Sequence, residues 1–109
     1  MISKPRWIAE CFLMDRFFPQ FKAFARNGTI GFQGKLEGPR TKRIYDVTLQ
    51  ASVRTYPELE PAVYMSPHPE PHHWIGTEQR LCVKWNWYPS GNTFEDILLI
   101  VAKYIAEFD

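Results

Sequence analysis

IYDVTLQASV, residues 44–53, is the stretch of this sequence that decides the fold. Apolar side chains alternate with polar ones along it, at Tyr45, Val47, Leu49, Ala51 and Val53. Successive side chains of a strand point to opposite faces of a sheet. The alternation therefore predicts a strand with one packed face and one face in water, as antiparallel sheets commonly have.

The residues on either side predict antiparallel partners for this strand. Asn27-Gly28 lies between two extended runs, and both residues tolerate positive φ, which is a strong hairpin signal. Gly38-Pro39 marks the next turn. Residues 62–65, AVYM, form a further short run between proline-flanked turns. Five of the nine prolines lie between positions 57 and 71, which excludes a regular sheet centre there and predicts an extended, ordered loop.

Helical signals stand at both ends of the chain. Ser3 is the expected N-cap of a first helix with Pro5 in its opening turn. Its inward stripe has helical spacing and ends before Pro19: Trp7, Cys11, Met14 and Phe18. Thr93 and Asp96 form an acidic variant of the capping box before a last helix. That helix has a wide apolar face: Phe94, Ile97, Leu98, Val101, Ile105 and Phe108. Helix, four antiparallel strands, proline-rich loop and helix together predict an α+β fold.

The composition fits one soluble, cytoplasmic domain. The chain has 109 residues, of which 45% are hydrophobic and 16% aromatic, so it can build a core. A formal charge of +1 argues against a nucleic-acid surface, and we interpret the basic run Arg40, Lys42 and Arg43 as a solvated hairpin face. No run approaches the roughly 20 apolar residues of a membrane span. Charged residues interrupt the N-terminal stretch, which excludes a signal peptide: Arg6, Glu10, Asp15 and Arg16.

The two cysteines fall in different surroundings. Cys11 shares a helical stripe with three large apolar side chains, which predicts a buried core thiol. Cys82 lies in RLCVKWNW, residues 80–87, where the apolar set is Leu81, Val83, Trp85 and Trp87. In an extended segment Cys82 points away from that set, alongside Arg80, Lys84 and Asn86. The two cations favour the thiolate, which is the attacking form, so Cys82 is a candidate nucleophile.

The nearby histidines leave two other interpretations open. Together with Cys82 they could supply three nitrogens and a sulfur to zinc: His68, His72 and His73. The spacing matches none of the paired signatures that make zinc predictions strong. His73 could instead activate Cys82 as a general base, as in a Cys–His hydrolase, but no Gly-rich oxyanion turn stands beside the cysteine.

Several motifs occur in a familiar order: LEGP (36–39), YDVTLQASV (45–53), YPELEPAVYM (56–65), the histidines, LC (81–82), WYP (87–89) and a helix. This ordered set, over residues 1–108, resembles the ubiquitin-conjugating enzyme (UBC) fold. The family has an N-terminal helix, a four-stranded antiparallel meander, a Tyr-Pro…Pro element and a histidine-led loop before the active cysteine. The resemblance implies a single UBC-like domain, residues 1–109, with a cysteine-bearing loop and a following helix.

The chain departs from the eukaryotic family in two ways. The family carries His-Pro-Asn before the cysteine, and its asparagine stabilises the oxyanion; at that offset this chain has His73-Trp74-Ile75. The chain also stops after the helix that follows the cysteine, without the family's last two helices. A shortened, asparagine-free version with the cysteine retained resembles the bacterial branch found in antiphage operons, including CBASS (cyclic-oligonucleotide antiphage signalling).

The resemblance implies an acyltransferase that needs no cofactor and no metal. Cys82 would carry the C-terminus of a cGAS/DncV-like nucleotidyltransferase or of a ubiquitin-like protein as a thioester and pass it to an amine. An adenylating activating enzyme is an expected partner; nucleic acid and membrane are not. His73 is the first candidate for the missing oxyanion donor, with Asn86 and Asn92 behind it, and Asn92 also suits a plain turn.

The resemblance assigns supporting roles as well. Tyr56-Pro57 and Pro61 would be scaffold residues behind the active site, and the first helix, with Arg6, would contact the activating enzyme. Three aromatic residues would pack the cysteine segment onto the core, and one of them could line a groove for the tail: Trp85, Trp87 and Tyr88. The alternative function is a non-catalytic UBC-like adaptor that binds a ubiquitin-like or nucleotidyltransferase partner.

Overall fold

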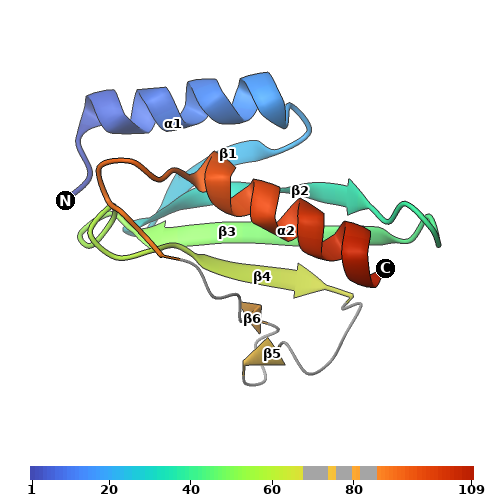
Figure 1. The fold of residues 1–109 in the computed structure, drawn as a ribbon. Coiled ribbons are helices and arrows are strands. Elements are labelled where there is room, and N and C mark those ends of the chain that lie inside the picture. Colours follow the sequence, from blue (N-terminus) through green and yellow to red (C-terminus); the bar gives the residue numbers. More distant parts are fainter. Residues whose placement is uncertain (68–73, 76–79, 82–85) are drawn as a thin grey trace.

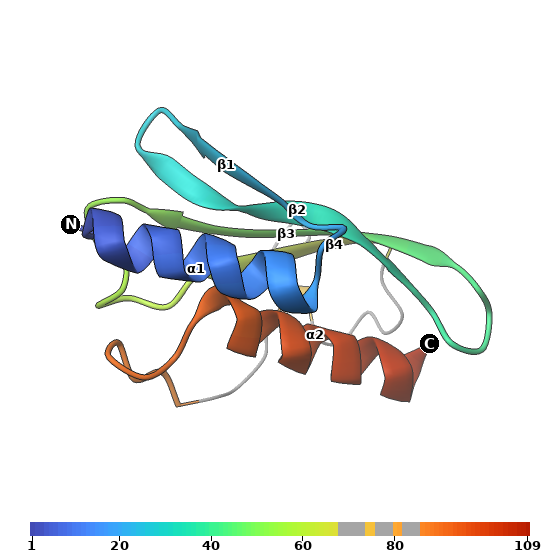
Figure 2. The same ribbon diagram turned by 90° about the horizontal axis from the view of Figure 1, so that it is seen from above.

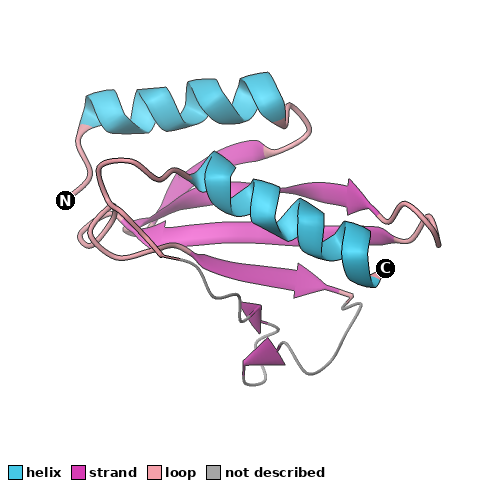
Figure 3. Cartoon of the chain, viewed as in Figure 1, coloured by secondary structure: helices cyan, strands magenta, loops and turns pink. Residues whose placement is uncertain are grey.

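The computed structural model describes residues 1–67, 74–75, 80–81 and 86–109, and it has the predicted α+β layout (Figures 1 and 3). A first helix precedes four main antiparallel strands, and a last helix follows them. The bounds are α1 (Lys4–Phe17), β1 (Lys22–Arg26), β2 (Thr29–Glu37), β3 (Ile44–Ser52), β4 (Ala62–Ser66) and α2 (Phe94–Phe108). Two short strands that the sequence pattern did not predict, β5 (Trp74–Ile75) and β6 (Arg80–Leu81), extend the sheet beyond β4.

The strand that decides the fold lies inside the sheet. The sheet order is β1-β2-β3-β4-β6-β5, so β3 pairs antiparallel with both β2 and β4. Tyr45, Val47 and Leu49 of β3 are at most 1% exposed. Asp46, on the other phase, is exposed and pairs with Lys35 across the strands. The predicted division into a packed face and a wet face is confirmed.

Both helices cover the packed face (Figure 2). Aromatic contacts join the two helices to the sheet, with ring centroids 5.3 Å apart for Trp7 and Phe32 and 5.2 Å apart for Phe32 and Phe94. The predicted α1 stripe meets this core, with Met14 buried and Trp7, Cys11 and Phe18 partly buried against it. In the described part of the chain, neither helix is long and apolar enough to cross a membrane.

The local turn and cap signals are also confirmed. Asn27 and Gly28 have φ of 51° and 75°, so they form the tight β1–β2 turn. The Ser3 hydroxyl accepts a hydrogen bond from the Arg6 N–H and caps α1. Thr93 and Asp96 exchange hydrogen bonds as a complete capping box at the start of α2. Each of these contacts is formed between residues only a few positions apart in the chain.

The last residue, Asp109, fastens the end of α2 to the β2–β3 turn. Its carboxylate accepts hydrogen bonds from the Thr41 hydroxyl at 2.6 Å, the Tyr45 hydroxyl at 2.7 Å, and the backbone N–H groups of Arg40 and Thr41 at 3.0 Å each. A Cβ on Gly38 would lie 2.2 Å from this carboxylate, so only glycine leaves it room. We expected the exposed basic run to be only a solvated face, but its first residue, Arg40, also bonds to Asp109 through its backbone N–H and its guanidinium.

We predict that Asp109→Asn lowers stability at neutral pH. The Thr41 and Tyr45 hydrogen bonds lower the pKa of Asp109 below its ordinary value of 3.8. A depressed folded-state pKa adds stability that is fully present above the unfolded-state value and is lost as the pH falls through the folded-state value. The free energy of unfolding, measured with urea, should therefore be lower for Asp109→Asn than for wild type at neutral pH. This difference should narrow as the pH falls toward about 2. A difference in free energy of unfolding that does not change with pH would contradict this prediction. Asp15→Asn, at an exposed position, is the control.

Candidate functional site

The predicted site falls partly outside the described residues. Cys82 and His73 lie outside them, as do His68 and His72. Asn86 is described and exposed, just before Trp87. The chain enters the segment that holds Cys82 from β6, which pairs with β4, and leaves it through Asn86. What the structure places is therefore the support on both sides of the candidate nucleophile.

Asn92 has the turn role that the sequence also allowed. Its side-chain oxygen accepts a hydrogen bond from the Tyr88 N–H at 2.8 Å, and its side-chain nitrogen donates to Asp96 at 3.3 Å. Both ends of the amide are thus engaged within the turn that leads into α2. A role for Asn86 or Asn92 as oxyanion donor stays a prediction.

Trp87, five residues after the candidate nucleophile, is anchored to the Tyr56-Pro57 element. The Trp87 indole N–H donates to the Pro57 carbonyl at 2.6 Å, and its ring packs on Tyr56 with centroids 5.8 Å apart. Packing of the aromatic cluster onto the core is therefore confirmed for Trp87. It is wrong for Tyr88, which is 63% exposed because the chain turns at Pro89-Ser90 and no longer alternates. Trp85 lies outside the described residues.

A buried carboxylate connects three parts of the chain beneath Trp87: α1, the Tyr56-Pro57 element and α2. Glu10 of α1 is 1% exposed. Its oxygens accept hydrogen bonds from the Arg6 Nε at 2.9 Å, from the Tyr56 hydroxyl, and from the Phe94 N–H of α2 at 3.0 Å. A negative charge at the first turn of α2 also interacts favourably with that helix's dipole. Glu10 is thus an ion-pair partner, a hydrogen-bond acceptor and a helix cap at once.

Arg6 extends this network to the turn after Trp87. Its guanidinium donates to the Pro89 carbonyl at 2.7 Å, to the Asn92 carbonyl at 2.6 Å and to the Tyr56 hydroxyl at 3.1 Å. Burial works against its charge, but the hydrogen bonds to Glu10 and Tyr56 outweigh this and raise the pKa of Arg6. We expected Arg6 to contact a partner protein. In the structure its guanidinium is already bonded to groups of the same chain.

Tyr56 is the neutral member of the network. It is fully buried, and burial, the hydrogen bond to Glu10 and the charge of Glu10 raise the pKa of the Tyr56 phenol far above its ordinary value of 10.0. The phenol therefore keeps its proton throughout the physiological range and donates a hydrogen bond to the Glu10 carboxylate. Tyr56 and the buried Pro61 are thus placed as the structural residues that the sequence suggested.

Cys11 is a poor nucleophile in this structure. It packs against the core as the helical stripe predicted, but it is half-buried and not fully buried, and its thiol is free. Burial, followed by the nearby charge of Glu10, raises the pKa of the Cys11 thiol. The thiol form predominates, and a thiol attacks much less readily than a thiolate.

Sequence reasoning missed Glu10 as a site residue, although a signal existed. Glu10 follows Trp7 by three residues and precedes Met14 by four, so it lies on the inward face of α1. A carboxylate on a packed face must be paired, because an unpaired buried charge is costly. Arg6 stands one turn before it and was the partner to expect.

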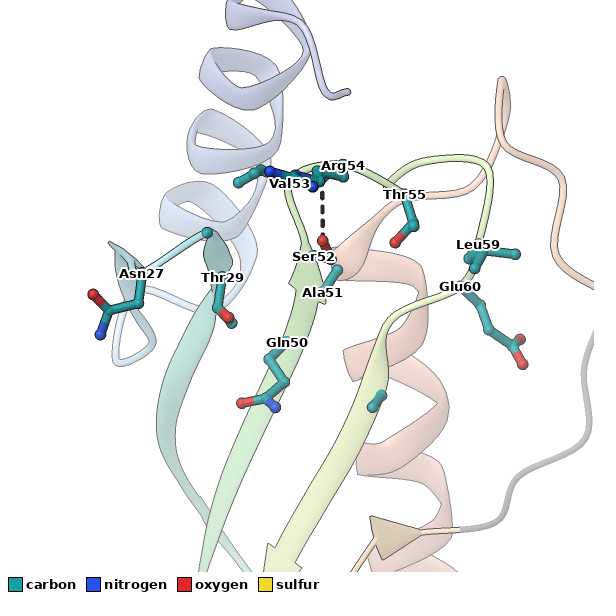
Figure 4. Close-up of a pocket in the computed structure, with 12 residues that line it drawn as sticks. Asn27, Thr29, Gln50, Ala51, Ser52, Val53, Arg54, Thr55, Leu59 and Glu60 are labelled. Carbon is teal, nitrogen blue, oxygen red and sulfur yellow. Dashed lines mark hydrogen bonds between the residues drawn. The ribbon is translucent and has the colours of Figure 1, made fainter.

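A hollow lined by described residues is separate from this network (Figure 4). It has a volume of about 730 Å³, is open to solvent, and lies where the β1–β2 turn, the end of β3 and the loop of residues 53–60 meet. Hydroxyls and amides face it, with Arg54 and Glu60 as the charged residues of its described lining. Neither Asn86 nor Asn92 lines it. Nothing in that lining identifies a ligand.

Metal ligation is not supported by the described part of the chain. No group of three histidine, cysteine or carboxylate side chains there could hold an ion. The residues of the zinc alternative, the three histidines and Cys82, lie outside that part. Comparisons with protein-family models, with curated proteins and with solved structures find no match to this chain.

We predict that Glu10→Ala destabilises the protein by roughly 3–5 kcal/mol. The substitution leaves the half-buried Arg6 guanidinium without its ion-pair partner and leaves the Tyr56 hydroxyl and the Phe94 N–H without their acceptor. Alanine is the better helix former, so helix propensity works against this effect. Urea unfolding measures the change. Asp15→Ala, exposed on the same helix, should shift stability by less than about 0.5 kcal/mol. A loss below about 1 kcal/mol for Glu10→Ala would mean that the network contributes little.

Proposed function

We propose that this chain is a bacterial ubiquitin-conjugating-enzyme-like acyltransferase whose nucleophile is Cys82. It accepts the C-terminus of a nucleotidyltransferase of the cGAS/DncV type, or of a ubiquitin-like protein, and transfers it to an amine in antiphage defence. The proposal rests on the ordered motifs of the sequence and on the polar phase of Cys82.

One observation carries the proposal beyond the sequence. Two of the motifs that make up the resemblance, Tyr56-Pro57 and Trp87-Tyr88-Pro89, lie thirty residues apart in the chain and contact each other through Trp87 and Pro57. Arg6 and Glu10 of α1 fix the same turn and the start of α2. A nucleophile works best on a segment whose support is rigid. The anchored Trp87, five residues after Cys82, would give the nucleophile such a support on that side.

The chemistry consists of two acyl transfers. The Cys82 thiolate attacks the carbonyl carbon of an adenylated C-terminus, or of a thioester on an activating enzyme; a C–S bond forms, and AMP or the enzyme's thiolate leaves. An amine of the target then attacks this thioester, the C–S bond breaks, and Cys82 leaves as a thiolate. The proton of the amine passes to solvent. Each step passes through an oxyanion, which a donor such as His73 would stabilise by about 3 kcal/mol.

The experiment is co-expression with the products of neighbouring genes, followed by intact mass measurement without reductant. Wild type should carry an adduct that a thiol reagent removes. Cys82→Ser should carry a thiol-resistant ester of the same acyl mass, and Cys82→Ala should carry none, because it lacks the attacking atom. Cys11→Ser is the matched control and should behave as wild type, since Cys11 is half-buried with a raised pKa.

Two outcomes would overturn this assignment. A partner that co-purifies with every variant while no adduct forms on any of them would identify the adaptor function. A metal retained by wild type and lost with His72→Ala or His73→Ala would mean that the histidines and Cys82 form a metal site. The mass of the adduct, where one forms, identifies the acyl donor.

A further inference from the structure

β1 is an edge strand whose outer side is open. It ends the sheet and, among the described elements, pairs with β2 alone. Four of its five residues are exposed and the fifth, Phe24, is half-buried. Such an edge presents unpaired backbone groups to any chain that can lie beside it.

The register shows which backbone groups are unpaired. Arg26 and Thr29 flank the two-residue turn and are opposite each other, so they exchange both backbone hydrogen bonds. The pattern then alternates along β1, and Phe24 and Lys22 also bond to β2. The N–H and C=O groups of Ala23 and Ala25 therefore point away from the sheet. They offer two donors and two acceptors to an added strand.

A groove runs beside these groups on the helix side of β1. It has a volume of about 210 Å³ and lies between α1 and the start of β1. Its apolar lining includes Cys11, Met14, Phe21 and Phe32, and its charged lining consists of Asp15 and Lys22. Ala23 shares the face of Phe32, its cross-strand partner, and its small side chain leaves the groove open. The residue of an added strand opposite Ala23 would direct its side chain into this groove.

The charge of this edge selects the partner. The strand itself carries two basic residues and no acidic one, Lys22 and Arg26, while Asp15 of α1 is the one acidic residue in the described lining of the groove. Lys22 and Arg26 share the solvent face of β1 with Phe24, and the Arg26 guanidinium lies 5.4 Å from the Phe24 ring centroid. Opposite charges on directly opposed residues of two strands stabilise the pairing, and like charges destabilise it.

We infer that the β1 edge binds an extended protein segment with an acidic residue at each end and apolar residues between, added to the sheet as a seventh strand. The acidic residues lie opposite Lys22 and Arg26, and an apolar side chain enters the groove beside Met14. Main-chain hydrogen bonds to Ala23 and Ala25 supply the general affinity, and the side chains supply the selectivity. This surface does not include Cys82, and the inference does not rest on the proposed transfer.

A second copy of this chain fits the edge poorly. In an antiparallel pair of β1 strands centred on Phe24, Lys22 of each copy lies opposite Arg26 of the other. Two like-charge pairs in one short strand oppose such a dimer. Basic residues on an edge strand also prevent it from pairing with another copy of itself. Lys22 and Arg26 could serve that purpose alone, so their preference for an acidic strand has to be measured with a peptide ligand.

The test uses the full chain and two synthetic peptides, Ser-Glu-Val-Phe-Val-Glu-Ser and its twin with lysine in place of both glutamates. Titration followed by amide NMR should shift the Ala23 and Ala25 signals with the acidic peptide, and the lysine twin should bind about tenfold more weakly. The double variant Lys22→Glu, Arg26→Glu should reverse this preference. Ala25→Pro removes an outward N–H that β2 does not use, so it should abolish binding and leave the fold intact.

Each remaining outcome would overturn the inference. Equal binding of both peptides, or no shift at either alanine, would mean that the edge does not select an acidic strand. Full binding by a folded Ala25→Pro variant would place the peptide elsewhere. If that variant fails to fold, the charge-reversal double variant still decides the question. Concentration-dependent dimerisation that protects Ala23 and Ala25 would make a second copy the occupant.

Discussion

The Glu10 carboxylate is the interaction on which the arrangement of this fold depends. It lies inside α1 and is buried, yet its partners come from three other places in the chain: Arg6 one turn away, Tyr56 after β3, and the first N–H of α2. A buried charge is tolerated only when its hydrogen bonds are satisfied. The positions of α1, the Tyr56-Pro57 element and α2 are therefore not independent, because moving any one of them leaves this carboxylate short of a partner.

A second carboxylate holds the other end of α2. Asp109 accepts hydrogen bonds from the β2–β3 turn and from Tyr45 of β3, while Glu10 satisfies the Phe94 N–H at the start of the helix. The apolar face of α2 determines that the helix packs on the sheet, but burial of apolar area is not directional. The hydrogen bonds that the two carboxylates accept are directional. They determine where along the sheet the helix begins and ends, and hence where the turn from Trp87 to Asn92 lies.

The sequence predicts the features that depend on neighbours in the chain. The alternation from Tyr45 to Leu49, the Asn27-Gly28 turn and the Thr93–Asp96 capping box are each complete within a few residues, and each is confirmed. Features that depend on distant partners were not predicted. The burial of Glu10 needs residues up to 84 positions away, and that of Asp109 needs a turn 68 positions away. β5 and β6 are two residues long, too short for any period to show. Cys82 and His73, on which the function rests, lie outside the described residues and stay predictions.

The edge of β1 and the anchored turn after Cys82 are separate places that share one helix. Sheet order puts β1 at one side and β6 near the other, so a strand on β1 leaves the route into the Cys82 segment free. Cys11, Met14 and Asp15 of α1 line the groove at β1. Arg6 and Glu10 of the same helix hold the turn that follows Trp87. Any ligand that prefers one position of α1 must act on both places, and by linkage the effect is reciprocal.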